Sequence, residues 1–374
     1  MTTIGVTTRG GRYPIIIERG LLARTGPALK ALGFSEPPIV IGDSRALGIH
    51  GKALLPSLER AFGRALVIRI APGEHAKSRH TLFGLYDALL RRRAHRGSWI
   101  IAFGGGVVSD VAGFSAATYL RGIRYVNVPT TLLAQIDSAI GGKVGINLGQ
   151  GKNLVGAFHQ PSAVLSDPEV LSSLPARELS SGLYEVVKCA AIRSPRLTGF
   201  LEARLPEVIR GEAAALQRVV VETARIKAAI ISGDEKERGK RMILNFGHTI
   251  GHALEAATAY ERFTHGEAIA WGMIGALALG VRLGISPPSS AARIVRLIRA
   301  VGRLPGLDGI PAGDLWNAFE RDKKFRGGRI RMVLLARTGA VRIIDDMHHA
   351  GLKRFLRSFL ARKGDFAALS ASAG

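Results

Sequence analysis

Short apolar runs alternate with helical patterns up to about residue 168, and this alternation limits the possible folds more than any other feature. Runs typical of buried strands occur at 37–41, 65–70, 98–103 and 125–129. The second run is followed by a helical pattern in which Leu82, Leu85, Leu89 and Leu90 recur at helical spacing. Strands that alternate with helices form mostly parallel sheets with helices on both faces. The sequence therefore predicts an α/β domain with a doubly wound sheet.

Three consecutive glycines follow the third run directly. Gly104, Gly105 and Gly106 separate it from a helix predicted over 107–120. Such a turn lets backbone amides approach a dinucleotide pyrophosphate at the helix N-terminus. The glycine spacing is not the usual dinucleotide fingerprint, so a tight turn without a ligand is an equal alternative. Asp43, after the first run, either accepts hydrogen bonds from ribose hydroxyls or caps a helix.

Helical patterns replace the strand patterns beyond about residue 168. Pro206 suits the first position of one of these helices, where a missing amide costs little. The predicted helices cover 178–192, 206–232, 242–257, 267–283, 291–301 and 352–360, and one β-like segment covers 330–335. We therefore predict two domains: a dinucleotide-binding α/β domain over 1–168 and an all-α metal-binding domain over 169–374.

Histidines and one glutamate in the second half suggest a metal site. His248 and His252 are four residues apart on a predicted helix and share one face, and His265 follows in the segment 264–267. Glu185 is flanked by apolar residues, and a buried carboxylate needs a charged partner or a metal. Imidazoles and a carboxylate with open coordination positions are typical of a catalytic divalent metal site. The residues leave open which two histidines bind, and whether Glu185 instead pairs with Lys188.

The net charge of +23 raises the question of an anionic partner. Basic residues are spread along the chain with little aromatic interleaving, so we predict no nucleic-acid partner. Lys143 and Lys152 lie in glycine-rich turns, where lysines suit phosphate or carboxylate oxygens. We therefore expect a polyanionic small-molecule substrate.

The compartment is predicted from three features. No apolar stretch reaches the length of about 18 residues typical of a membrane span. The first residues lack the charged and apolar regions of a signal peptide. Cys189 is the only cysteine, so no internal disulfide can form. We expect a cytoplasmic protein without membrane association.

Six blocks of the sequence together resemble the 3-dehydroquinate synthase family. The resemblance extends from about residue 72 to residue 335, and its blocks cover 103–113, 129–138, 141–147, 151–161, 245–255 and 265–273. It implies an N-terminal α/β domain that binds NAD and a C-terminal helical domain that binds zinc or cobalt. It also implies a homodimer.

The resemblance implies roles for individual residues. The metal ligands would be Glu185, His248 and His265, while His252 would face the substrate. Residues that bind anionic or hydroxyl groups of the substrate would be Asp137, Lys143, Asn153, Lys188, Lys227, Arg241 and Asn245, with Arg121 from the neighbouring subunit and with Glu237 and one of Lys323 or Lys324 in support. The NAD site would use Asp43, Glu74, Lys77, Gly105, Gly106, Asp110, Thr130, Thr131 and Lys152.

The implied activity is that of a lyase in the shikimate pathway. It would convert 3-deoxy-D-arabino-heptulosonate 7-phosphate into 3-dehydroquinate and phosphate by transient oxidation, phosphate elimination, re-reduction and aldol closure. Departures from the family pattern at Ala139, Tyr184, Cys189 and Lys240 remove none of the implied ligands. The alternatives are a metal-dependent polyol dehydrogenase and another sugar-phosphate cyclase of the same fold.

Overall fold

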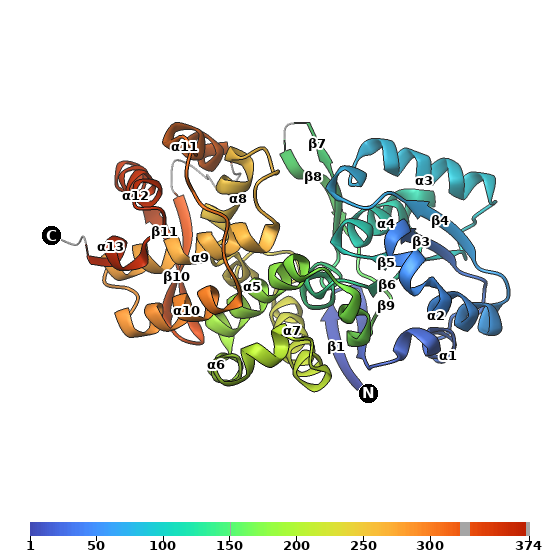
Figure 1. The fold of residues 1–374 in the computed structure, drawn as a ribbon. Helices are drawn as coiled ribbons and strands as arrows, with labels where there is room; N and C mark the ends of the chain where they lie inside the picture. The colour runs from blue at the N-terminus through green and yellow to red at the C-terminus, as the bar shows by residue number, and fades with distance from the viewer. Residues whose placement is uncertain (150, 322–329, 372–374) are drawn as a thin grey trace. The chain divides into compact units, whose positions relative to one another are not determined.

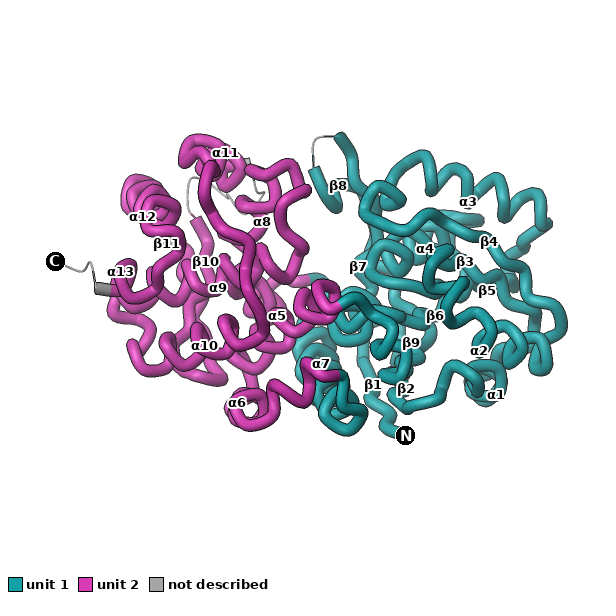
Figure 2. Tube along the Cα trace, viewed as in Figure 1, with its two compact units in different colours: residues 1–175, 211–236 teal, residues 176–210, 237–374 magenta. Residues whose placement is uncertain are grey.

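The computed structural model describes residues 1–149, 151–321 and 330–371, which form two compact units (Figure 2). The first unit comprises Met1–Pro175 and Gly211–Lys236, and the second comprises Ala176–Arg210 and Glu237–Gly374. The helix α7 (Ala213–Gly233) belongs to the first unit because it packs against two strands of that unit, β1 (Thr2–Thr8) and β2 (Gly11–Ile17). The sequence had placed this helix in the second domain. Lys323 and Lys324 lie outside the described residues.

The first unit contains a seven-stranded sheet in the order β1-β2-β9-β6-β5-β3-β4 (Figure 1). All neighbouring strands are parallel except β1 and β2, which form an antiparallel hairpin. The predicted doubly wound sheet is therefore confirmed. Its strands are β1 (Thr2–Thr8), β2 (Gly11–Ile17), β3 (Ile39–Asp43), β4 (Leu66–Ile70), β5 (Trp99–Gly104), β6 (Arg124–Pro129) and β9 (Ala163–Ser166).

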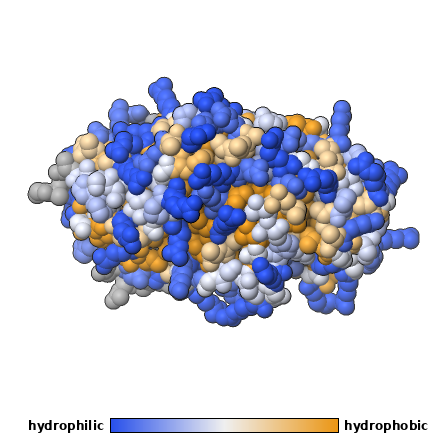
Figure 3. Space-filling model, turned by 90° about the horizontal axis from the view of Figure 1, so that it is seen from below, coloured by the Kyte–Doolittle hydropathy of each residue, from blue (hydrophilic) through white to orange (hydrophobic). Residues whose placement is uncertain are grey.

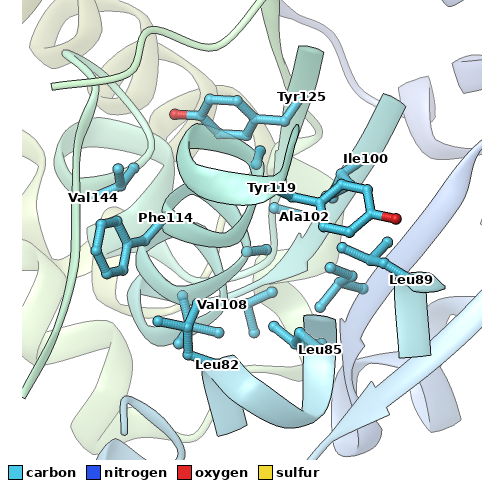
Figure 4. Packing of buried hydrophobic residues seen from close by; sticks show 14 of the residues in the cluster. Leu82, Leu85, Leu89, Ile100, Ala102, Val108, Phe114, Tyr119, Tyr125 and Val144 are labelled. Carbon is cyan, nitrogen blue, oxygen red and sulfur yellow. The ribbon is translucent and has the colours of Figure 1, made fainter. Parts of the chain in front are cut away.

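Helices cover both faces of this sheet. On one face α1 (Thr25–Ala31) packs against α2 (Ser44–Phe62), and on the other α3 (Arg79–Arg91) packs against α4 (Gly106–Thr118). Figure 4 shows the core beneath α3 and α4, where Leu82, Leu85 and Leu89 contact apolar side chains of β5 and α4. Three of the four leucines predicted for this helix are therefore buried, whereas Leu90 is wrong as a core residue because its side chain is exposed.

A separate antiparallel hairpin joins β7 (Lys143–Leu148) and β8 (Gly151–Phe158). β7 packs against α3 and α4. The turn before β7 requires glycine, because Gly141 and Gly142 have φ values of 99° and 65°. This turn places Lys143 at the start of the hairpin, where its side chain is exposed.

The second unit is mainly helical and includes one hairpin, β10 (Ile330–Arg337) with β11 (Ala340–Met347). Its helices are α5 (Ala176–Arg193), α6 (Pro195–Ile209), α8 (His248–Ala257), α9 (His265–Arg282), α10 (Pro288–Val301), α11 (Ala312–Arg321), α12 (His349–Ala361) and α13 (Phe366–Ala371). No helix in the described ranges combines the length and apolar character that crossing a membrane requires.

The predicted single helix over 206–232 is wrong. The chain forms α6 and α7 instead, and between them Gly211 adopts a φ of 78° that ends the helical path. Pro206 lies inside α6 rather than at its start. The proline at the start is Pro195, and Ser194 caps the helix by accepting a hydrogen bond from the Leu197 amide.

Glycines let α9 approach its neighbours to backbone contact. A Cβ on Gly266 would lie 2.0 Å from the carbonyl oxygen of Ser181 in α5. A Cβ on Gly272 would lie 1.9 Å from the carbonyl oxygen of Gly247, which precedes α8. Both distances are far shorter than any real Cβ contact. The packing of α5, α8 and α9 therefore depends on the missing side chains at these positions.

We predict that Gly272→Ala destabilises the protein by about 1–3 kcal/mol or more, because the added methyl group must displace backbone atoms. The free energy of unfolding from urea denaturation measures the effect. Gly199→Ala is the matched control, since a Cβ on this helical glycine meets no atom within 4 Å. The control should be neutral or stabilising. Equal stability of Gly272→Ala and Gly199→Ala would contradict the packing account.

Candidate active site and its cofactor-binding edge

Three elements of the second unit bring one carboxylate and two imidazoles together. Glu185 lies on α5, His248 is the first residue of α8, and His265 is the first residue of α9. Glu185 Oε1 lies 3.8 Å from His248 Nε2 and 3.9 Å from His265 Nε2. Ligand atoms at about 2.1 Å from a tetrahedral zinc are about 3.4 Å apart from each other. The two separations from Glu185 Oε1 therefore suit one metal ion after a small contraction, and the three residues offer ligand atoms that all lie within 4.8 Å of one another.

The two imidazoles present the same nitrogen to the carboxylate. His248 Nδ1 lies 3.3 Å from the carbonyl oxygen of Phe246, and His265 Nδ1 lies 3.4 Å from Glu255 Oε2. An acceptor beside Nδ1 favours the tautomer that carries its proton there. Both Nε2 atoms can then offer a lone pair toward Glu185 Oε1. This is the arrangement that metal-binding histidines normally adopt.

Glu185 has the surroundings of a ligand rather than those of a structural carboxylate. The residue is fully buried, and neither of its oxygens has a hydrogen-bond partner among the described residues. The ammonium group of Lys188 does form a close ion pair with Oε2. From the sequence, an ion pair with Lys188 and a metal were alternative partners for Glu185. In the structure Lys188 pairs with Oε2, while His248 and His265 face Oε1. A divalent cation at Oε1 fits this donor set.

A second potential ligand group shares His265 with the first. His252, Glu255 and His265 also place ligand atoms within 4.8 Å of one another. His252 lies beside both other imidazoles, with ring centroids 5.1 Å from His248 and 5.9 Å from His265. Sequence reasoning missed Glu255. Its position seven residues after His248 on the same helix was the available signal, but its contact with His265 is made through the tertiary fold.

The carboxylates near His265 raise the pKa of its imidazole. Burial lowers the pKa of the imidazole, but the charge and hydrogen bond of Glu255, together with the charge of Glu185, raise the pKa above its ordinary value. The side chain keeps 31% of its surface exposed. Two anionic groups thus act on one imidazole, which favours a cation at this position.

Residues predicted to bind NAD gather at the carboxyl edge of the first unit's sheet. β3 pairs with β4 on one side and β5 on the other, so the strand order reverses between β3 and β5. Doubly wound sheets bind ligands at such a reversal. Asp43 ends β3 and Gly104 ends β5, and a Cβ on Gly104 would lie 3.2 Å from Asp43 Cβ. The alternation of strands and helices therefore places both residues at one edge.

The glycines and threonines complete this edge. The Thr130 amide donates to the Gly104 carbonyl at 2.9 Å, and a Cβ on Gly105 would lie 3.1 Å from Thr131 Cγ2. No side chain caps the N-terminus of α4 within the described ranges. Its first amides can therefore bind an anion. Asp43 also caps α2 through Oδ1, so the capping interpretation of this residue is confirmed and leaves ribose binding as a prediction.

A polar network surrounds the buried ammonium group of Lys77. This group contacts the carboxylate of Asp110 and the side-chain oxygen of Asn153. Burial raises the pKa of Asp110, while Lys77 opposes that shift. The structure thus groups Asn153, predicted for the substrate, with residues predicted for NAD.

Asn147, which sequence reasoning assigned no role, joins this network to Glu74. Its side-chain amide donates to Glu74 at 2.7 Å, and its oxygen accepts from the Asn153 amide at 2.9 Å. Lys152 lies 4.0 Å from the same Glu74 oxygen. These contacts join the loop before α3 to β7 and β8. Four other predicted residues thereby share one polar cluster with Lys77, namely Glu74, Asp110, Lys152 and Asn153.

Other predicted substrate residues lie in two further groups. In the first unit, Lys227 on α7 donates to the Asp137 carbonyl at 2.6 Å and also pairs with its carboxylate. In the second unit, Asn245 donates to Glu237 at 2.6 Å, and Arg241 lies buried between them in the chain. Arg121 is exposed after α4 and has a φ of 69°, which is unfavourable for a residue with a side chain.

Hydrophilic side chains do not gather into one region of the face that Figure 3 shows. On the face shown in Figure 3, hydrophilic side chains are interspersed with apolar patches. The predicted absence of a nucleic-acid partner remains a prediction.

Two family models match the sequence in succession. The 3-dehydroquinate synthase N-terminal model matches residues 67–181, and the C-terminal model matches residues 182–325. The chain belongs to the 3-dehydroquinate synthase family. The resemblance stated from the sequence blocks is thereby confirmed.

Curated relatives of this family are similar over nearly the whole chain. A 3-dehydroquinate synthase from Symbiobacterium thermophilum is 44% identical over 90% of this chain and 94% of its own length. A second, from Pelotomaculum thermopropionicum, is 42% identical over 96% of both chains.

Solved structures of related cyclases share the fold. A 2-deoxy-scyllo-inosose synthase complexed with carbaglucose-6-phosphate, NAD⁺ and Co²⁺ has a TM-score of 0.86 and 27% identity, covering 96% of this chain and all of that one. A 2-epi-5-epi-valiolone synthase from Streptomyces hygroscopicus subsp. jinggangensis 5008, with NAD⁺ and Zn²⁺, has a TM-score of 0.85 and 28% identity, covering 94% and 97%. A glycerol dehydrogenase from Schizosaccharomyces pombe, 17% identical with a TM-score of 0.67, shares the fold alone.

The buried ion pair between Lys188 and Glu185 predicts that substitutions of the two residues have coupled effects on the free energy of unfolding. The protein for this experiment is first freed of metal by a chelator. Lys188→Met leaves the Glu185 charge buried without its counter-charge, so we expect the free energy of unfolding to fall by about 3 kcal/mol. Adding Glu185→Gln should recover most of this loss, because the uncompensated charge is then gone. Urea denaturation of both single variants and the double variant measures the coupling. If Lys188→Met is as stable as the unsubstituted protein, the pair contributes nothing.

Proposed function

We propose that this chain is a 3-dehydroquinate synthase. It would convert 3-deoxy-D-arabino-heptulosonate 7-phosphate into 3-dehydroquinate and phosphate, with NAD and zinc or cobalt as cofactors. The observation that carries the proposal is the convergence of His248 Nε2 and His265 Nε2 on the buried Glu185 Oε1 in a chain of this family. The names of relatives 39–44% identical to this chain support it.

The proposed metal ligands are Glu185, His248 and His265, and His252 faces the substrate. The metal would act as a Lewis acid on the hydroxyl group that is oxidised. Glu185 contributes a negative charge to the site. The ion pair between its Oε2 and the ammonium group of Lys188 neutralises part of that charge. The two Nδ1 contacts hold the imidazoles in fixed orientations.

The proposed NAD site lies at the carboxyl edge of the first unit's sheet. NAD would accept and return the hydride. Gly105 and Gly106 let the chain approach the pyrophosphate, and the first amides of α4 bind its oxygens. Asp43 binds ribose hydroxyls through the oxygen that does not cap α2. The polar network of Glu74, Lys77, Asp110 and Lys152 borders this edge, with Thr130 and Thr131 beside the glycines.

Basic residues would bind the anionic and hydroxyl groups of the substrate. Lys227 is held in place by the Asp137 carbonyl and carboxylate, so its ammonium group is ordered before any ligand arrives. Lys143 is exposed and can reach a phosphate or carboxylate. Arg241, Asn245 and Glu237 supply a charge and two hydrogen-bonding groups, and Asn153 supplies another. This supply of cations argues for a sugar phosphate over a neutral polyol.

The assembly and compartment belong to the same proposal. Arg121 would serve a neighbouring subunit of a homodimer. Its backbone, like that of Leu120 before it, has a positive φ that costs free energy in a residue with a side chain. Such backbone strain supports a role for this exposed segment in contact with the neighbouring subunit. A cytoplasmic location remains a prediction.

Phosphate release with a catalytic amount of NAD tests the proposal. The zinc-loaded protein should release many phosphate molecules from the heptulosonate phosphate per NAD, without a matching rise in NADH absorbance, because the hydride returns to the same substrate. Steady one-to-one accumulation of NADH from a simple polyol, with no phosphate release, would favour the dehydrogenase and defeat the proposal.

Two lysine variants act as a matched pair in this assay. Lys143→Ala should raise the KM for the sugar phosphate and slow turnover, with little change in the NAD requirement. Lys152→Ala should instead raise the NAD concentration needed for half-maximal rate. The same response from both variants would contradict the separate roles of the two lysines.

A further inference from the structure

We propose that Glu255 is a positioning residue that holds His265 for metal binding. Its carboxylate accepts a hydrogen bond from Nδ1–H of His265, which fixes the ring so that Nε2 offers its lone pair to the ion. This inference rests on the proposed metal site at Glu185, His248 and His265. It adds a residue that lies behind that site rather than in it.

The His265 ring lies between two carboxylates. Its Nδ1 is 3.4 Å from Glu255 Oε2, at the long end of the hydrogen-bonding range, and its Nε2 is 3.9 Å from Glu185 Oε1. The two ring nitrogens point in different directions, so each carboxylate faces its own nitrogen. Glu185 is therefore placed to share a metal with His265, and Glu255 is placed to orient it.

A carboxylate behind a histidine does more than fix the tautomer. Its negative charge makes the opposite nitrogen a stronger electron-pair donor, and loss of such a partner typically lowers metal affinity 10-fold to 100-fold. His248 has a neutral acceptor in the same place, the Phe246 carbonyl at 3.3 Å. The two imidazoles are thus polarised unequally, and His265 becomes the stronger donor.

The presence of a buried glutamate at position 255 is not explained by the preferences of the helix itself. The residue lies near the C-terminal end of α8, where the helix dipole disfavours a negative charge. It is also buried, and burial of a carboxylate is unfavourable without compensation. Its backbone carbonyl accepts from the Tyr260 amide at 2.8 Å, which anchors the end of the helix and fixes where the side chain begins. The position is costly unless the carboxylate has a cationic neighbour.

The alternative is that Glu255 binds the metal itself, together with His252 and His265. A metal there would use Nδ1 of His265 and would leave Glu185 Oε1 buried without a hydrogen-bond partner among the described residues. The ion at Glu185 satisfies that oxygen and keeps Glu255 as acceptor of the Nδ1 proton. The geometry therefore favours the positioning role.

Metal affinity tests the inference directly. Zinc and cobalt dissociation constants are measured by chelator competition on the full chain, and the visible spectrum of the cobalt-loaded protein reports the ligand field. Glu255→Gln keeps the size of the side chain and loses its charge, so we expect affinity to fall 10-fold to 100-fold and the cobalt bands to shift. Glu255→Asp, which keeps the charge, should lose less.

Glu267→Gln is the matched control. Glu267 is a buried carboxylate two residues after His265, but it pairs with Arg177 and accepts from the Thr264 amide. Its loss should lower stability at the start of α9 while leaving metal affinity and the cobalt spectrum close to those of the unsubstituted protein. An equal loss of affinity in both glutamine variants would show a general structural effect and overturn the inference.

Two histidine variants separate failure of the inference from failure of the metal site. His248→Ala should abolish tight binding, and His252→Ala should retain it. If Glu255→Gln leaves the metal affinity and the cobalt spectrum unchanged while His248→Ala abolishes tight metal binding, only the positioning role of Glu255 is overturned. Loss of binding in Glu255→Gln and His252→Ala, with retention in His248→Ala, would make Glu255 a ligand and overturn both proposals.

Discussion

Backbone contact between α5, α8 and α9 is the constraint on which the proposed metal site depends. Each close approach lies next to a ligand. Gly266 follows His265 and meets the Ser181 carbonyl one helical turn before Glu185, while Gly272 meets the Gly247 carbonyl directly before His248. Side chains at the two glycines would separate the helices by more than the few tenths of an ångström that metal coordination tolerates. The ligands therefore converge because these helices lack side chains where they cross.

The two units position their functional groups by different physical means. In the first, the reversal of strand order between β3 and β5 brings Asp43 and Gly104 to one edge, and the uncapped start of α4 supplies backbone donors. In the second, buried charges on Glu185 and Lys188 compensate each other while histidines face the remaining oxygen. A nucleotide phosphate needs backbone amides that a rigid sheet edge holds in place, and a divalent ion needs a few ligand atoms within coordination distance. The first unit provides the amides, and the second unit provides the ligand atoms.

Sequence reasoning succeeded where the signal is local. The alternation of apolar runs and helices was enough to predict β3 to β6. The family resemblance named Glu185, His248 and His265 together, and the structure brings these three side chains close to one another. It failed where tertiary contacts decide. The helix predicted over 206–232 ignored Gly211, whose positive φ divides it. The spacing of Glu255 from His248 was visible in the sequence, but its contact with His265 was not, because His265 lies on another helix. Asn147 was likewise invisible, since its contacts with Glu74 and Asn153 require the folded hairpin.

The position of the metal tests the central claim most directly. Anomalous diffraction at the zinc edge, on crystals of the zinc-loaded protein, locates the ion without assumptions about its ligands. The account predicts one zinc within about 2.3 Å of Glu185 Oε1, His248 Nε2 and His265 Nε2. A zinc bound by His252 and Glu255, or no zinc near any of these residues, would contradict it.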